Sequence, residues 1–221
     1  MDLFGKAADP DDEDEGGGQE EEDGEPEDDF NAAWEVLDLA RAIYDKQAME
    51  EGDEETKLKL ADTYIALGDV SLETGTSIFL WKVKIRCIDG CHVEKFDQAI
   101  SDYEAGLKLK LELLPTSSRH IAEAHYKLSI VLDLTSGRLS DAIGHAGKAL
   151  ASVEARLAVL RDGLAGKLPP LPEPTHDPKG KGKSTKTKLL RDDVVQNMSK
   201  SHIENEIKEM EGLSEDLALK V

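Results

Sequence analysis

Few residues of the sequence have the type and spacing that catalysis or metal binding needs. The segment Cys87–His92 reads Cys-x-x-x-Cys-His, which matches part of a zinc site, but zinc takes about four ligands and no second pair lies nearby in the sequence. Gly182–Ser184 ends like a phosphate-binding loop, yet Asp177 stands where that loop needs its first glycine. His125 and His145 have no nucleophile or orienting partner at a catalytic spacing. The sequence therefore predicts that the protein is not an enzyme and takes no cofactor or metal.

The strongest chemical signal is negative charge. The 221 residues carry a formal net charge of −20, and fourteen acidic residues lie between Asp9 and Asp29, where there is no Lys or Arg. Lys and Arg bind nucleic-acid phosphates by displacing counterions, so a chain this acidic is not expected to bind nucleic acid directly. It is expected to attract basic proteins instead, and histones are the most abundant of these in a eukaryotic cell.

Residues 1–29 form an acidic tract that we expect to be disordered. The tract has too few apolar residues to offset the entropy cost of ordering it. We expect it to engage histones through its charge, although a solubilising tail would have the same composition. Its candidate histone-binding residues are Asp11, Asp12, Glu13, Asp14, Glu15, Glu20, Glu21, Glu22 and Asp23.

No segment predicts export or a membrane span. The start, Met1–Lys6, lacks the apolar core of a signal peptide. The most apolar stretch, Ser77–Ile88, is interrupted by charges and is too short to cross a bilayer. The two cysteines make no disulfide framework, which fits a reducing compartment such as the cytosol or the nucleus.

Residues 161–188 read as a linker rich in Pro and Lys, in which the prolines prevent a helix from continuing. The basic part of this linker is a candidate nuclear-import signal, or else a flexible segment that folds back on the acidic tract. We expect a nuclear location, with a cytoplasmic pool as a further option. The candidate import residues are Lys179, Lys181, Lys183, Lys186 and Lys188.

The rest of the chain has the periodicity of amphipathic helices. The expected helices run from about residue 30 to 44, 55 to 72, 94 to 107, 120 to 134 and 140 to 160. A last helix, within residues 189–221, begins at Leu189 or Ser199 and ends near Leu219. It would cap the array, since terminal repeats need a polar face. The predicted fold class is all-α, with a helical domain over residues 30–160.

Two copies of one helix-turn-helix motif lie within this domain. Leu67–Gly68 and Phe96–Gly106 form the first copy, and Tyr126–Ser129 and Ala142–Ala149 form the second. Small residues recur where the paired helices must approach closely, and large residues fill the gap. This is the pattern of the tetratricopeptide repeat, whose period is about 34 residues. A generic helical bundle is the alternative interpretation.

The spacing between the two helices of the first copy is longer than in the tetratricopeptide repeat. Leu67 and Ala99 lie too far apart in the sequence, and the nineteen residues of Gly75–Val93 account for the excess. This insert, residues 75–93, is apolar and β-leaning, which suggests a retained intron or another gene-model artefact more than a functional loop. Removing it would join Thr74 to Glu94 and restore an ordinary tight turn.

Three segments carry a resemblance to a known family: Phe30–Arg41 directly after the acidic tract, Ala122–Leu128, and Asp141–Leu160. They resemble the nuclear autoantigenic sperm protein family. In that family an acidic segment interrupts one repeat of a tetratricopeptide array, and the domain chaperones histone three with histone four and also binds linker histone. The resemblance implies a histone chaperone acting in nuclear delivery and chromatin assembly. It also implies that the chain is N-terminally truncated, and it leaves a homodimer open.

The first helix of each tetratricopeptide pair lines a groove, which is the candidate binding site. The groove combines acids with apolar and aromatic residues, which suits an amphipathic basic peptide such as a histone helix, although ordinary solvated helix faces have the same composition. It lacks the basic clamp of a heat-shock-protein adaptor; a scaffold for another basic or amphipathic peptide is the alternative. The predicted groove residues are Asp62, Ile65, Asp69 and Leu72 in the first pair and Glu123, Tyr126, Ile130 and Asp133 in the second.

Overall fold

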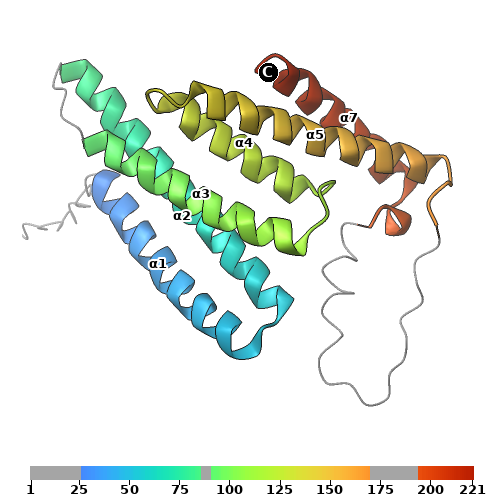
Figure 1. Cartoon of the computed structure of the whole chain (residues 1–221), viewed down its shortest axis with the longest axis horizontal. Helices are drawn as coiled ribbons and strands as arrows, with labels where there is room; N and C mark the ends of the chain where they lie inside the picture. Colours follow the sequence, from blue (N-terminus) through green and yellow to red (C-terminus); the bar gives the residue numbers. More distant parts are fainter. Residues whose placement is uncertain (1–25, 86–90, 170–193) are drawn as a thin grey trace, which may run out of the picture.

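The computed structural model describes residues 26–85, 91–169 and 194–221, and within them every regular element is a helix. The order is α1 (Pro26–Glu51), α2 (Glu54–Ile85), α3 (Cys91–Leu113), α4 (Arg119–Leu134), α5 (Leu139–Leu164), the 3-10 turn η1 (Val195–Asn197) and α7 (Lys200–Ala218). Each α-helix packs on the one before it, as Figure 1 shows. The predicted all-α, tetratricopeptide-type array is confirmed. None of these described helices is long and apolar enough to cross a membrane.

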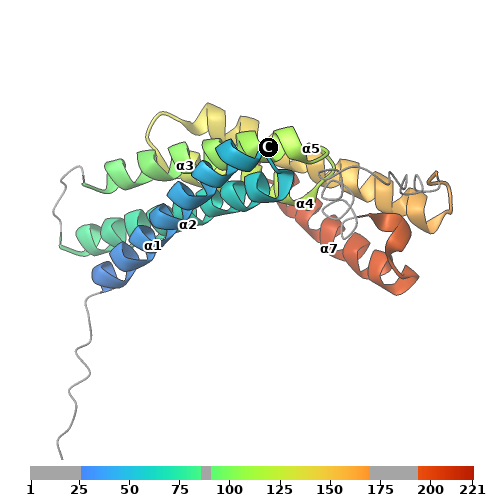
Figure 2. The ribbon, with the colours of Figure 1, turned by 90° about the horizontal axis from the view of Figure 1, so that it is seen from below.

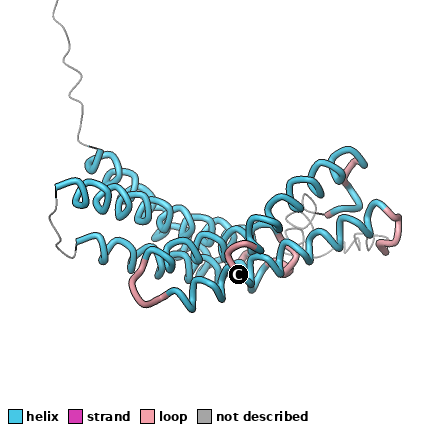
Figure 3. Tube along the Cα trace, turned by 90° about the horizontal axis from the view of Figure 1, so that it is seen from above, coloured by secondary structure: helices cyan, strands magenta, loops and turns pink. Residues whose placement is uncertain are grey.

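The array is bent rather than straight. Figures 2 and 3 show α1, α2 and α3 forming one arm, and α5 with α7 forming the other. Helices α2, α4 and α7 lie along the inner side of the bend, and α3 and α5 lie along its outer side (Figure 2). The helices expected to line a groove are therefore on the same side of the molecule.

Gly52 and Asp53 set the turn between α1 and α2. Gly52 has a φ of 63°, a left-handed conformation that glycine adopts without strain. Asp53 then caps α2, because its carboxylate accepts hydrogen bonds from the Thr56 hydroxyl and from the Glu55 N–H, both at 2.7 Å. These bonds lower the pKa of Asp53. A cap of this kind stabilises a helix by about 1 kcal/mol.

Glycine allows α2 and α3 to pack closely. A Cβ at Gly68 would lie only 2.5 Å from a ring carbon of Tyr103, which is fully buried. A Cβ at Gly106 would lie 2.9 Å from the carbonyl oxygen of Ala61. The structure thus confirms that the small residues of the repeat motif lie where the paired helices approach each other.

The predicted turn after Leu72 is wrong. Helix α2 continues to Ile85, and Cys91 already belongs to α3, so the described part of residues 75–93 extends both helices. Residues 86–90, which include Cys87, lie outside the described residues.

Packing against α3 explains why α2 stays helical there. A Cβ at Gly75 would lie 2.7 Å from a ring carbon of Phe96, so the two helices are still in close contact at this point. The hydroxyl of Thr74 donates to the carbonyl of Val70 at 2.7 Å, which removes it as a competitor for other backbone groups. Tertiary contact therefore overrides the β propensity of the sequence.

The predicted capping helix is confirmed as α7. It begins at Lys200, directly after Ser199, whose side chain accepts a hydrogen bond from the N–H of His202 at 3.3 Å. Its apolar residues join those of α5 and η1 in a second buried cluster, separate from the one formed by α2, α3, α4 and the start of α5. The helix thus covers the otherwise open side of α5.

Candidate functional site

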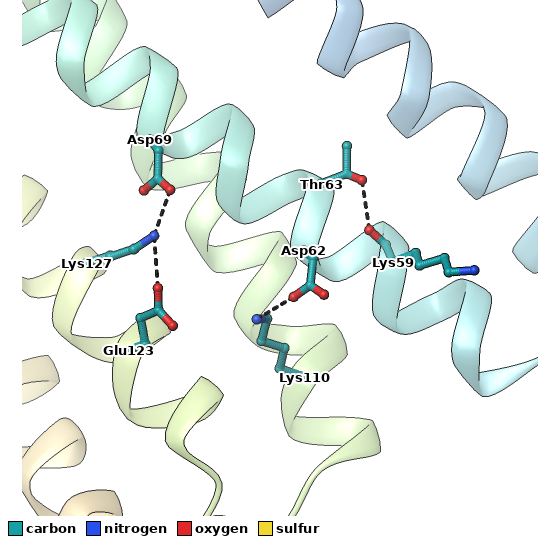
Figure 4. Close-up of polar contacts among 7 residues, drawn as sticks. All are labelled: Lys59, Asp62, Thr63, Asp69, Lys110, Glu123 and Lys127. Carbon is teal, nitrogen blue, oxygen red and sulfur yellow. Dashed lines mark hydrogen bonds and ion pairs between the residues drawn. The ribbon is translucent and has the colours of Figure 1, made fainter. Parts of the chain in front are cut away.

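The candidate site is the inner face of the array, formed by side chains of α2 and α4. Asp62 and Asp69 project from α2, and Glu123 projects from α4. Their side chains are 56%, 45% and 49% exposed, respectively. Figure 4 shows these three acids together with the two lysines that contact them. The predicted acidic character of this face is therefore present at its surface.

Lys127 joins the acids of the two helices. Its Nζ lies 2.7 Å from Oδ2 of Asp69 and 3.2 Å from Oε1 of Glu123. Partial burial lowers the pKa of Lys127, but the hydrogen bonds to Asp69 and Glu123 outweigh burial, so the pKa is raised overall. One ammonium group thus satisfies two carboxylates that belong to adjacent repeats.

Asp69 is also fixed from behind by Tyr103. The buried hydroxyl of Tyr103 donates to Oδ1 of Asp69 at 2.8 Å. Burial, followed by the bond to Asp69, raises the pKa of Tyr103, so this hydroxyl stays protonated and keeps donating. Contacts from α3 and α4 therefore hold the Asp69 carboxylate in one place.

Asp62 has its own internal partner. The Nζ of Lys110 on α3 lies 2.7 Å from Oδ1 of Asp62, and the Lys110 side chain is only 4% exposed. A buried stem with its charge directed at a surface acid is the usual arrangement for a lysine at the edge of a core. The outer helix thus contributes a charge to the inner face.

Sequence reasoning missed these partners. The spacing of Glu123 and Lys127, four residues apart on one helix, could have indicated their contact. No sequence spacing indicates that Tyr103 or Lys110 reaches an acid of α2, because those contacts depend on how α3 packs against α2.

One predicted groove residue of α2 is buried, and a second is partly buried. Ile65 is only 7% exposed and belongs to the core cluster formed with α3 and α4. A Cβ at Gly106 would lie 2.9 Å from Cδ1 of Ile65, which shows how closely this side chain packs on α3. Leu72 is partly buried against the same cluster. The prediction that Ile65 lines an open groove is therefore wrong.

The second half of the inner face is more apolar. Tyr126 is 38% exposed, and Ile130 and Asp133 lie further along the same helix, at the edge of a surface depression. Exposed apolar residues of α4 and α5 continue this surface: they are Leu134, Leu139 and Ile143. Lys220, just after α7, lines the depression too, with its Nζ 4.8 Å from the centroid of the Tyr126 ring.

The two histidines singled out in the sequence face each other between α4 and α5. Nδ1 of His125 lies 3.0 Å from Nδ1 of His145. Burial, together with the nearby His145 and Lys148, lowers the pKa of His125 to about 4. One neutral ring can donate to the other, which ties the two helices together. Among the residues that the structure describes, no group of three or more His, Cys, Asp or Glu could hold a metal ion.

Ion pairs hold α7 in place beside α4 and α5. Arg156 and Glu206 are both nearly buried and form two hydrogen bonds, at 2.8 and 3.2 Å. Exposed pairs add to this contact: they are Arg119 with Glu209 at 3.3 Å and Arg161 with Glu211 at 2.8 Å. The capping helix is thus held by charge as well as by apolar packing.

The other candidate residues cannot be placed. The acidic tract from Asp11 to Asp23 and the basic cluster from Lys179 to Lys188 both lie outside the described residues. They stay predictions from the sequence.

Comparison with known proteins finds one matching family and several relatives. The family described as SHNi-TPR, a tetratricopeptide type, matches residues 90–117. NASP-related protein sim3 of Schizosaccharomyces pombe is 37% identical over 114 residues, which are 51% of this chain and 24% of that protein. The nuclear autoantigenic sperm protein of Homo sapiens is 28% identical over 130 residues, 59% of this chain and 14% of that protein.

A further relative is named for the ligand that it binds. Histone-binding protein N1/N2 of Xenopus laevis is 29% identical over 125 residues, which are 57% of this chain and 17% of that protein. The chain therefore spans a quarter or less of the length of these curated relatives.

Proposed function

We propose that this chain, whose matches confirm its resemblance to the nuclear autoantigenic sperm protein family, is a histone chaperone that binds histone three with histone four on its inner face. The relatives support a histone-chaperone role in general, since one of them is named for histone binding. The particular histone pair, linker histone as a further ligand, and a role in nuclear delivery and chromatin assembly all belong to the proposal.

The observation that carries this proposal is the pairing of acids with apolar side chains on one face. Half-exposed Asp62, Asp69 and Glu123 line α2 and the start of α4. Tyr126 follows Glu123 by three residues on α4, and Ile130 lies one turn further on, at the surface depression. A histone helix presents Arg and Lys next to apolar residues, so both parts of this face have a counterpart. Matching charge and shape together is what discriminates one partner from another.

Lysines of this chain lower the negative charge of this face but do not cover its carboxylates. Lys127 and Lys110 reduce the net charge of the acids, but the carboxylates they contact keep about half of their surface exposed. Arginine binds a carboxylate with two parallel hydrogen bonds, which a lysine cannot do. A histone arginine can therefore compete with Lys127 for Asp69 or Glu123.

The test is a binding titration with the histone three–histone four complex, with poly-lysine as a ligand of similar charge but no defined shape. Tyr126→Ala should weaken histone binding by about thirtyfold, because loss of a central aromatic anchor commonly costs about 2 kcal/mol or more. Binding of poly-lysine should weaken much less, because poly-lysine lacks the apolar side chains that a histone helix adds to this contact. Glu123→Gln should weaken both ligands, since it removes charge without removing shape.

A matched control is Glu112→Gln, which makes the same charge change at an exposed position on the outer helix α3. Circular dichroism should show that every variant is folded. Equal loss of histone and poly-lysine binding in Tyr126→Ala would contradict a specific site on the inner face, as would no loss of either.

A further inference from the structure

The contact between Lys220 and Tyr126 places a cation of this chain on the proposed binding face. The Nζ of Lys220 lies 4.8 Å from the centroid of the Tyr126 ring, within the range of an attractive cation–π contact. The Tyr126 residue is 38% exposed, so it lies at the surface of the protein. The structure therefore shows directly which kind of group this ring accepts.

The residues around this contact also suit a basic ligand. Lys220 lines one depression together with Ile130, Asp133 and Ile143. Asp133 is exposed, and no ion pair or hydrogen bond of its carboxylate is found within the part of the chain that the structure describes. Asp62, Asp69 and Glu123, by contrast, are all paired with lysines. Asp133 thus offers negative charge that no described residue of this chain neutralises.

Along α4, these groups follow one another at helical spacing. Tyr126, Ile130 and Asp133 are four and three residues apart, so they share one face of the helix. Leu134 and Ile143, which are 47% and 40% exposed, supply apolar surface beside them. A ligand that covered all of them would need a cation and an apolar residue about one helical turn apart.

Lys220, the residue of this chain that lies over Tyr126, supplies a cation but little apolar surface. Leu217, 5% exposed, anchors the end of α7 in the core shared with α5, and Lys220 follows one turn later with its N–H bonded to the carbonyl of Leu217 at 3.0 Å. The intervening Leu219 is 88% exposed and covers little of the apolar surface. Lys220 therefore fills the cation position and leaves the apolar surface open.

We propose that the ring of Tyr126 forms a subsite for one lysine or arginine of the bound histone, that the neighbouring histone residues cover Ile130 and Ile143 and bring a second basic group to Asp133, and that Lys220 occupies the Tyr126 subsite until the histone displaces it. The proposal rests on the proposed function, since it names the ligand group that one part of the inner face recognises. It also makes Lys220 an internal competitor, so that binding is tighter when Lys220 is removed.

The experiment compares two variants with the same change of charge. Lys220→Met removes the competing ammonium and keeps an unbranched apolar stem, whereas Lys208→Met makes the same change at an exposed lysine within α7. Affinity for the histone three–histone four complex should rise roughly twofold to fivefold more in Lys220→Met than in Lys208→Met, which is the weight of an exposed cation–π contact. In a Tyr126→Leu background, which has no ring for either cation, the extra gain should disappear.

The outcomes separate this inference from the proposed function. Wild-type binding with equal gains in the two lysine variants would leave the proposed function standing and overturn the subsite, because only bulk charge would matter. Absence of histone binding by the wild-type chain would overturn both. A second readout covers the case in which Tyr126→Leu does not fold: nuclear magnetic resonance should show the ring-shifted ε-methylene signal of Lys220 move to its ordinary position when the histones are added. An unmoved signal at saturation would overturn the subsite.

Discussion

Lys127 lies 2.7 Å from Asp69 and thereby ties α4 to α2 across the inner face. Because it also contacts Glu123, its removal should release two carboxylates at once. Lys127→Met should cost about 1 kcal/mol of unfolding free energy, the upper end for pairs that are partly exposed. It should also tighten histone binding at low salt, since the released acids attract basic ligands. Urea unfolding and titrations at two salt concentrations measure these effects.

The control for this variant is Lys108→Met, an equal charge change at an exposed position of α3. It should leave the unfolding free energy nearly unchanged. If both variants tightened histone binding to the same extent, the released acids would not be the cause.

The sequence predicted the helices well because their apolar periodicity is a local property. It also predicted the close approach at Gly68 and Gly106, since small residues at repeat positions indicate where helices must pack. It failed at Leu72, where β-leaning residues suggested a break in the helix. Whether they stay helical depends on Phe96 packing over Gly75, a contact between residues far apart in the chain.

The candidate site was predicted only in part, for a similar reason. The exposure of Asp62, Asp69 and Glu123 was predicted, because acids at exposed helix positions can be identified from spacing. Ile65 was misplaced, because the position it occupies faces α3 rather than solvent. The cation over Tyr126 comes from Lys220, almost a hundred residues away, and no local pattern predicts such a contact.

The buried pair of Arg156 and Glu206 should matter far more than an exposed pair of the same kind. Both side chains are less than a tenth exposed, so removing the carboxylate leaves a guanidinium in an environment that water hardly reaches. Glu206→Met should therefore cost about 3–5 kcal/mol. Glu211→Met should cost less than about 1 kcal/mol, because its pair with Arg161 is about half exposed. Urea unfolding measures both values.

A double variant distinguishes charge from packing. Arg156→Met with Glu206→Met removes both buried charges and should recover much of the lost unfolding free energy. If the double variant were as unstable as Glu206→Met alone, lost packing rather than the loss of the Glu206 charge beside Arg156 would explain the result.

The contact of His125 with His145 should make stability depend on pH. Burial, His145 and Lys148 lower the pKa of His125 to about 4, whereas an unperturbed histidine has a pKa of 6.5. As pH falls, the unfolded chain therefore takes up this proton before the folded chain does. The stability linked to His125 should be fully present above pH 6.5 and be lost progressively as pH falls towards 4.

His125→Gln should flatten this dependence in thermal unfolding curves between pH 4 and 7.5. Acidic side chains also titrate in the lower part of this range, so the comparison must be between variants. His120→Gln, at an exposed position of the same helix, should keep the wild-type profile. A wild-type slope that His125→Gln left unchanged would rule out this histidine as its source.

The acidic tract between Asp9 and Asp29 should act through long-range charge rather than through fixed contacts. It holds fourteen acids and no basic residue. The part before Pro26 lies outside the described residues, whereas the end of the tract, expected to be disordered, already forms the start of α1. Exposed charges are screened within about 8 Å at physiological ionic strength, so attraction that depends on them weakens as salt is added. Replacing seven of these acids with Asn or Gln should lower histone affinity and its salt dependence together. Tyr126→Ala, in contrast, should lower affinity without changing the salt dependence, because it removes contact area and no charge. Titrations of the two variants from low to high salt therefore separate the two parts of the chain, and an unchanged affinity and salt dependence in the tract variant would leave the tract as a solubilising tail.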